Sequence, residues 1–164
     1  MVNSVIDIMK NLTLILFSFL IVLITGCSPN GNVAESNYTI RYGTSFGECL
    51  GDCFIETSIT EYQATLNVQE YIIGRQTEPE IRTQKSLTAQ DFERISNLVD
   101  TDIIQALPET IGCPDCADGG AEWIEIQSPE MHKKVTFEYL NEPNVLKNLV
   151  TELREIQNNL YEQD

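Results

Sequence analysis

The sequence predicts an α+β domain, in which an antiparallel sheet of about six strands carries two main helices on one face. Six segments between residues 38 and 140 alternate apolar and polar side chains, as half-buried strands do. Two other segments repeat apolar residues at helical spacing, one after the fourth strand and one after the sixth. The order is therefore ββββαββα, and helices laid on one face of an antiparallel sheet are its natural packing.

Four strands are predicted in the first half of the domain. They cover residues 38–42, 53–60, 63–73 and 81–87. The first connection contains three glycines and Cys49, which predicts an irregular loop, whereas Glu61 and Tyr62 make a tight turn between the second and third strands. Short connections between successive strands indicate an antiparallel meander.

The first helix is predicted at residues 89–99. Thr88 is a favourable N-cap, and Asp91 three residues later approximates a capping box. The apolar residues of this segment recur at helical spacing and predict one buried stripe: Phe92, Ile95, Leu98 and Val99. A short helical turn at 102–107 follows and ends before Pro108.

A hairpin and a final helix complete the predicted domain. Residues 122–128 and 133–140 alternate and are joined by a short turn that contains Pro129. Asn141 and Pro143 then open the last helix. Its apolar face comprises Val145, Leu146, Leu149, Val150, Leu153, Ile156 and Leu160.

The amino terminus predicts a lipid-anchored precursor. Residues 12–24 are almost entirely apolar, which matches the hydrophobic region of a signal peptide and is short for a membrane span. The run ends in Ile24-Thr25-Gly26-Cys27, which resembles the bacterial lipobox. That resemblance implies cleavage before Cys27 and lipidation of its thiol. We therefore expect a lipoprotein signal peptide at 1–26, a lipidated tether at 27–37 and a single α+β domain at 38–164.

The residues after Cys27 give an expected location. Lipoproteins that stay in the inner membrane of Gram-negative bacteria typically have Asp directly after the lipidated cysteine, whereas this chain has Ser28. No acidic cluster that resembles a surface-export signal follows Cys27. The resemblance implies an outer-membrane lipoprotein that faces the periplasm. The inner membrane and the cell surface remain open alternatives.

The net charge excludes one class of partner. The formal charge is -15, and Asp7 and Lys10 cancel within the predicted signal peptide, so the charge belongs to the mature part. A chain this acidic is a poor nucleic-acid binder, because phosphate contacts require Lys and Arg. Anionic headgroups should also repel it, so the membrane is a partner only through the lipid at Cys27. A basic protein or another envelope component is a possible further partner.

Four cysteines remain after Cys27, and they form two close pairs in glycine-rich loops: Cys49, Cys53, Cys113 and Cys116. Outside the cytoplasm an even set of cysteines predicts disulfides, and three connectivities are possible. Local pairs would each contribute roughly 2 kcal/mol, and pairs across the chain roughly 4 kcal/mol. Two alternatives stay open, a four-thiolate zinc site and a thiol-redox role for the C-x2-C pair. We expect no cofactor.

Two stretches carry a family resemblance. Residues 44–53 (TSFGECLGDC) and 111–123 (IGCPDCADGGAEW) resemble an uncharacterised family of bacterial lipoproteins and secreted domains with paired cysteine loops. The resemblance covers most of the mature chain. It implies one compact domain and brings no established activity.

The sequence gives little support to catalysis. His132 is the only histidine, and no serine-hydrolase or zinc-protease motif is present. Asp115, Asp118 and Glu122 do not have the spacing of an EF-hand, so we interpret them as solvated loop acids rather than calcium ligands. The sequence thus favours a non-enzymatic binding or scaffolding domain stapled by disulfides. The alternative is a periplasmic thiol-redox or metal-binding protein that uses the four cysteines.

Overall fold

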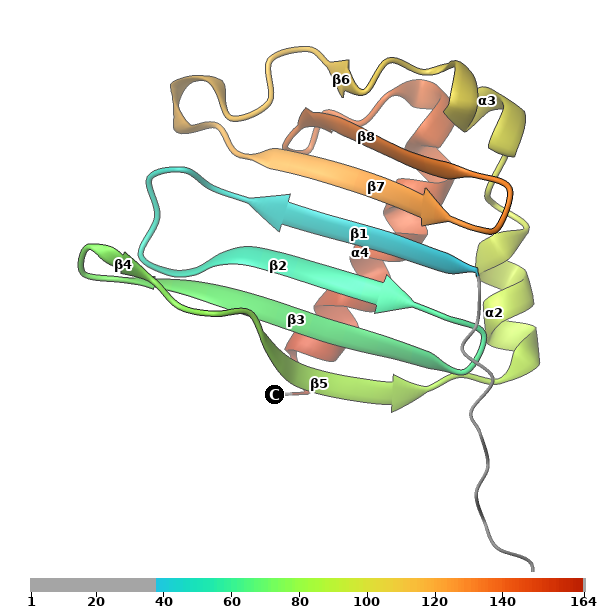
Figure 1. Ribbon diagram of the computed structural model, residues 1–164, viewed down its shortest axis with the longest axis horizontal. Coiled ribbons are helices and arrows are strands. Elements are labelled where there is room, and N and C mark those ends of the chain that lie inside the picture. The colour runs from blue at the N-terminus through green and yellow to red at the C-terminus, as the bar shows by residue number, and fades with distance from the viewer. Residues whose placement is uncertain (1–37, 164) are drawn as a thin grey trace, which may run out of the picture. The chain divides into compact units, whose positions relative to one another are not determined.

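The computed structural model describes residues 38–163, which form a mixed eight-stranded sheet with three α-helices (Figure 1). The α+β class predicted from the sequence is confirmed. The predicted signal peptide, Cys27 and the tether lie outside the described residues. Within residues 38–163, no helix has the length and apolar character needed to cross a membrane.

The first half of the sheet is an antiparallel meander, as predicted. Its four long strands are β1 (Thr39–Ser45), β2 (Gly51–Ile59), β3 (Gln63–Ile72) and β5 (Glu80–Ser86). The far end of β3 also folds back on the two-residue strand β4 (Arg75–Gln76). The turn between β3 and β4 contains Gly74 at a φ of +76°, a conformation that glycine adopts without strain.

The second half of the sheet is added beside β1. Strands β7 (Ala121–Gln127) and β8 (His132–Glu138) form the predicted hairpin, and β7 pairs with β1. The amino-terminal strand therefore lies in the middle of the order β4-β3-β2-β1-β7-β8-β6. Strand β6 (Thr110–Ile111) runs parallel to β8, which corrects the expectation of a purely antiparallel sheet. The strands missed by the sequence, β4 and β6, have two residues each, too few to show alternation.

Three α-helices cover the described domain. The bounds are α2 (Ala89–Ser96), α3 (Thr101–Ala106) and α4 (Lys147–Tyr161). The capping box of Thr88 and Asp91 is confirmed, because each residue bonds to the backbone N–H of the other. Helix α4 follows a 3-10 turn (Asn144–Leu146) and crosses one face of the sheet, while α2 and α3 lie at the end where β8 begins (Figure 1).

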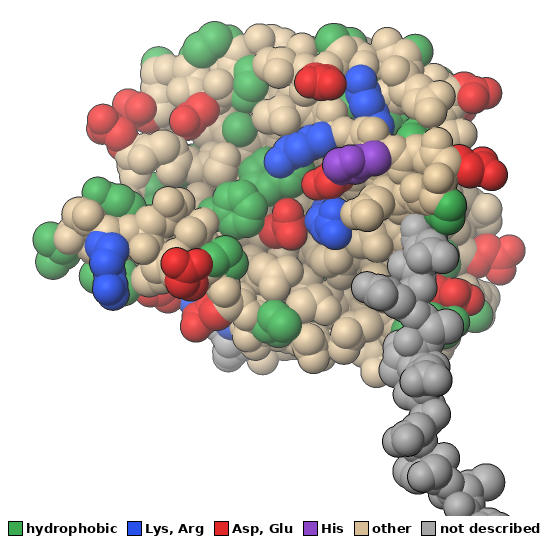
Figure 2. Space-filling view, in the orientation of Figure 1, with side chains coloured by type: hydrophobic (Ala, Val, Ile, Leu, Met, Phe, Trp, Pro, Cys, Tyr) green, Lys and Arg blue, Asp and Glu red, His purple; other side chains and the backbone are tan. Residues whose placement is uncertain are grey.

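The core lies between the sheet and α4. Ile40 on β1 is in register with Ile59 on β2 and Ile126 on β7, and all three are fully buried. Leu149, Val150, Leu153 and Leu160 of α4 cover this face of the sheet, as their predicted apolar stripe requires. Burial of each such side chain contributes about 1.5–3 kcal/mol. The opposite face of the sheet is left open by α4, and it is the face seen in Figure 2.

A carboxylate is buried inside this core. Glu122 is 0% exposed, and it accepts hydrogen bonds from the Tyr42 hydroxyl at 2.6 Å and the Leu140 N–H at 3.2 Å. Arg154 of α4 donates to both of its carboxylate oxygens, at 3.1 and 2.9 Å, and also to Glu142 at 2.9 Å. We call Tyr42, Glu122, Glu142 and Arg154 the carboxylate clamp. It joins β1 and β7 to α4.

The clamp overturns one prediction. Glu122 is not a solvated loop acid, because its register opposite Thr44 on β1 and Phe137 on β8 places it on the core face of the sheet. Glu122 lies in the same strand as Ile124 and Ile126, at positions two and four residues before them, so the three side chains share the buried face.

Removal of the cationic partner should destabilise the domain strongly. Arg154→Met leaves Glu122 buried without its charged partner, and we expect a loss of about 3 kcal/mol in the free energy of unfolding. The matched control is Arg94→Met, which breaks the exposed pair of Arg94 with Glu152 and should cost less than about 1 kcal/mol. Urea denaturation measures both. Equal losses in the two variants would contradict the clamp.

The clamp also predicts an alkaline limit to stability. Burial, followed by the hydrogen bond to Glu122, raises the pKa of Tyr42 well above its ordinary value of 10.0. Below that value both states carry a neutral phenol; above it the unfolded chain ionises while the folded chain does not. Stability should therefore fall as the pH rises beyond about 10. Denaturation midpoints from pH 8 to 11 should fall less steeply in Tyr42→Phe than in the wild type.

Candidate functional site

The four cysteines are paired locally. Cys49 and Cys53 lie at bonding distance with a Cα–Cα separation of 5.6 Å, and Cys113 and Cys116 do so with a separation of 5.5 Å. The structure thus confirms disulfides and selects one of the three connectivities that the sequence left open. Each bridge closes its own loop and contributes roughly 2 kcal/mol in the loop-entropy model. With all four sulfurs bonded, none is a free thiolate for a metal.

The second cysteine loop is tightly coiled. Asp115 and Asp118 have positive φ values of 60° and 58°, and the Asp115 N–H donates to the Gly120 carbonyl at 3.0 Å. After Cys116 there is only a 3-10 turn (Cys116–Asp118) before β7 begins. Dithiol oxidoreductase motifs open a longer helix, so this local geometry departs from that pattern.

Strand β8 holds this loop in place. The Cys113 N–H donates to the Glu138 carboxylate at 2.9 Å, and the Asn141 amide donates to the same group at 2.7 Å. These two hydrogen bonds lower the pKa of Glu138. Gly112 fits above this carboxylate with a φ of +72°, and a Cβ there would lie 2.6 Å from a carboxylate oxygen. The loop is therefore fixed to the sheet as well as closed by its disulfide.

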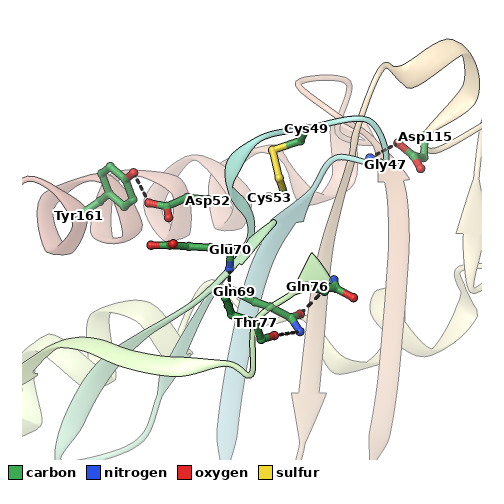
Figure 3. The surroundings of a disulfide bond; sticks show 10 residues. All are labelled: Gly47, Cys49, Asp52, Cys53, Gln69, Glu70, Gln76, Thr77, Asp115 and Tyr161. Atoms are coloured by element: carbon green, nitrogen blue, oxygen red, sulfur yellow. Dashed lines mark hydrogen bonds between the residues drawn. A yellow bond between two sulfur atoms is a disulfide. The ribbon is translucent and has the colours of Figure 1, made fainter. Parts of the chain in front are cut away.

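The two cysteine loops, distant in sequence, meet at one end of the sheet. The Gly47 N–H donates to Asp115 Oδ1 at 3.2 Å (Figure 3). A Cβ at position 47 would lie 2.7 Å from Asp115 Oδ2, so a larger residue there would displace the Asp115 side chain. The Phe46 ring packs edge-on against Tyr139 with a centroid distance of 4.9 Å. Asp115 thus acts as a bridge between the loops.

A hollow of about 300 Å³ lies beside this bridge, and we call it the loop-end pocket. Its walls come from β1, from the first cysteine loop and β2, from the β3–β4 hairpin and from the second cysteine loop. The lining residues are Ser45, Phe46, Gly47, Cys53, Phe54, Tyr71, Gln76 and Asp115. The volume is at the lower end of the range for small-molecule sites. The pocket brings together the two motifs that the sequence singled out.

Polar contacts fix the hairpin wall of the pocket. Gln76 Nε2 donates to Gln69 Oε1 at 3.3 Å, and Gln69 Nε2 donates to the Thr77 carbonyl at 2.6 Å (Figure 3). The guanidinium of Arg82 donates a hydrogen bond to the carboxylate of the next residue, Glu70, at 2.8 Å, and another to the carboxylate of Asp52 at 2.7 Å. These contacts hold β2, β3, β4 and β5 together at the pocket end.

An aromatic pair lies behind the pocket on the open face of the sheet. Phe54 packs against Trp123 with a centroid distance of 5.0 Å, and the Lys134 ammonium lies 4.4 Å from the indole centroid. Trp123 crosses Gly43, where a Cβ would be 2.1 Å from the indole. Trp123 is 3% exposed, and its Nε1 has no hydrogen-bond partner among the described residues. The pocket wall at Phe54 is therefore rigidly supported.

The acids considered as calcium ligands are not brought together. Asp115 and Asp118 are exposed, whereas Glu122 is in the core. Among residues 38–163, no group of three or more His, Cys, Asp and Glu side chains is arranged to hold a metal ion. His132 is exposed at the start of β8 and lies 2.6 Å from Glu125. No described residue among the sequence candidates other than Asp115 and Cys53 lines the loop-end pocket.

A second hollow, of about 330 Å³, lies between α2 and α4. Its floor is apolar and includes Ile95 and Leu160, while charged side chains form its rim. Arg94 on this rim is paired with Glu152. The loop-end pocket is the better candidate, because it joins both cysteine loops and combines three aromatic residues with one carboxylate.

Sequence reasoning missed the aromatic lining of the pocket. Phe46 and Phe54 flank the cysteines, and Phe54 and Tyr71 occupy strand positions opposite to the buried apolar residues. A large ring on the polar face of a strand is the sequence signal by which Phe54 and Tyr71 could have been found. Their convergence depends on the register of β2 with β3, which no local pattern contained.

Comparison of the chain with protein-family models and with curated proteins gave no match. The resemblance to lipoproteins with paired cysteine loops therefore stays a prediction. Functional inference depends on the site itself.

The two disulfides should differ in their resistance to reduction. Cys113 and Cys116 are both exposed, whereas Cys53 is buried at 7% exposure. Exposed bridges are the more easily reduced, because the attacking thiolate can reach a sulfur atom. Dithiothreitol titration followed by alkylation and peptide mass mapping should show Cys113 and Cys116 modified first. Simultaneous modification of both pairs, or a cross-linked peptide joining the two loops, would contradict the structure.

Proposed function

We propose that the chain is a lipid-anchored cell-envelope protein whose disulfide-stapled domain binds a ligand without catalysis. The observation that carries this proposal is the pairing of all four cysteines of the described domain in two disulfides. Such bridges persist in oxidising compartments. Cys27 stands apart from both pairs, in the stretch that resembles a lipobox. The two observations support the same location.

The loop-end pocket supports the binding role. Its walls are held by two disulfides, by the hydrogen bond from Gly47 to Asp115 and by the contacts of Gln69. A site whose walls are already ordered loses little conformational entropy when a ligand binds. Nearby loops also expose aliphatic side chains, Leu50 at 78% and Ile73 at 92%. These residues offer a partner surface next to the pocket.

The position of the pocket suits a protein tethered at its amino terminus. Strand β1 begins at Thr39 and runs towards the cysteine loops, so the pocket lies at the opposite end of the sheet from the start of β1. The predicted tether would reach roughly 30 Å when extended. We propose that Cys27 holds the chain on the outer membrane and that the domain faces the periplasm.

A thiol-redox role is the second candidate. The exposure of Cys113 and Cys116 favours it, because a substrate thiol could reach this pair. The 3-10 turn that follows Cys116 speaks against it. Acid quenching of cells followed by thiol trapping separates the two functions. A binding protein should carry both bridges fully oxidised, whereas a substantial reduced fraction at Cys113 and Cys116 would favour redox chemistry.

Lipidation at Cys27 is directly testable in the full chain. The wild-type protein should incorporate labelled palmitate, sediment with membranes and be released by detergent. Cys27→Ser should lose the label and accumulate as the uncleaved precursor, because the thiol that accepts the lipid is absent. The control is Cys49→Ser combined with Cys53→Ser, which removes a disulfide and should leave labelling intact. Labelling that persists in Cys27→Ser would contradict the anchor.

A further inference from the structure

We infer that the loop-end pocket binds an organic cation, an alkylammonium group held between aromatic rings and the carboxylate of Asp115. This inference rests on the proposed binding function and adds the chemical class of the ligand. The lining of the pocket includes three aromatic residues, Phe46, Phe54 and Tyr71, and one carboxylate, that of Asp115. Aromatic faces attract ammonium groups through the negative charge density above the ring, and such rings recognise quaternary ammonium ligands.

The three rings belong to different segments of the chain. Phe46 is held by its edge-on contact with Tyr139, and Phe54 by its contact with Trp123. Tyr71 belongs to β3, opposite Gln76 on β4, and its side chain is 38% exposed. The rings therefore come from three separate parts of the chain, and those of Phe46 and Phe54 are held by packing contacts before a ligand binds.

Asp115 supplies the negative charge. Its Oδ1 accepts the hydrogen bond from Gly47, and the residue is exposed. The backbone of Asp115 is itself anchored by the 3.0 Å bond to the Gly120 carbonyl and by the neighbouring disulfide. The carboxylate is thus positioned before a ligand arrives.

Charge decides between ligand classes. Lys and Arg are absent from the lining of the pocket, and the chain carries a formal charge of -15. The negative charge of the chain would repel an anion, and no Lys or Arg of the lining would offset that repulsion. A cation is instead attracted by the field of the whole domain and by Asp115. A neutral saccharide would gain hydrogen bonds from Ser45 and Gln76 and nothing from the charge. The lining therefore favours the cation.

Choline is a suitable probe, and the chain supplies its own reporter. Trp123 is the only tryptophan, and it touches the pocket residue Phe54. Titration of the disulfide-intact protein with choline should change the tryptophan emission and saturate. The neutral isostere 3,3-dimethylbutan-1-ol, which has the same shape without the charge, should bind at least about tenfold more weakly. Glucose and inorganic phosphate complete the comparison.

Two neighbouring acids give a matched pair of variants. Asp115→Asn keeps an acceptor for the Gly47 N–H and removes only the charge, so choline affinity should fall about tenfold or more. Asp118→Asn changes an exposed acid of the same loop that does not line the pocket, and it should bind choline like the wild type. Tyr71→Leu should also weaken binding, because it removes an accessible ring. Far-ultraviolet circular dichroism confirms that each variant is folded.

Equal binding of choline and its isostere, or equal loss in Asp115→Asn and Asp118→Asn, would overturn the cation assignment. Saturable binding of glucose with no response to choline would show that the pocket binds a saccharide and not a cation. The proposed binding function would then still hold. Absence of any response to choline would also overturn it. None of these results bears on lipidation at Cys27 or on the state of the disulfides in cells, so failure of the proposed function is detected separately.

Discussion

The fold depends on a buried carboxylate with a full set of donors. Glu122 lies in the core between β7 and α4, and an ion at such a position is tolerated only when it is paired and hydrogen-bonded. Tyr42, Arg154 and the Leu140 N–H together meet that requirement. Because the donors come from β1, from the chain after β8 and from α4, the carboxylate fixes how helix and sheet meet. A shifted helix would leave the charge unpaired.

The clamp and the loop-end pocket are connected through β1 and β7. Tyr42 and Thr44 face the core on β1, while Ser45, at the end of the same strand, lines the pocket. On β7, Glu122 faces the core and the adjacent Trp123 faces the open side, where it supports Phe54. Strand alternation thus lets one pair of neighbouring residues serve both layers. The pocket is set in a part of the sheet that the core already holds rigid.

The disulfides act locally, and hydrogen bonds join the loops. Each bridge spans a few residues, so neither links the two halves of the chain. The Gly47 N–H and the Asp115 carboxylate make a long-range connection, and a side chain at position 47 would displace that carboxylate. The Asp115 carboxylate therefore lies where the two cysteine loops meet. The pocket chemistry follows from that junction rather than from the cysteines.

The sequence by itself determined the α+β class, the long strands, the capping box at Thr88 and the apolar stripe of α4. These features arise from local periodicity and capping, which neighbouring residues decide. The tertiary structure alone decided the pairing of β7 with β1, the parallel strand β6, the cysteine connectivity and the buried state of Glu122. The pocket belongs to the second group. Its lining comes from four separate segments, and their meeting is set by strand register and loop packing over long sequence distances.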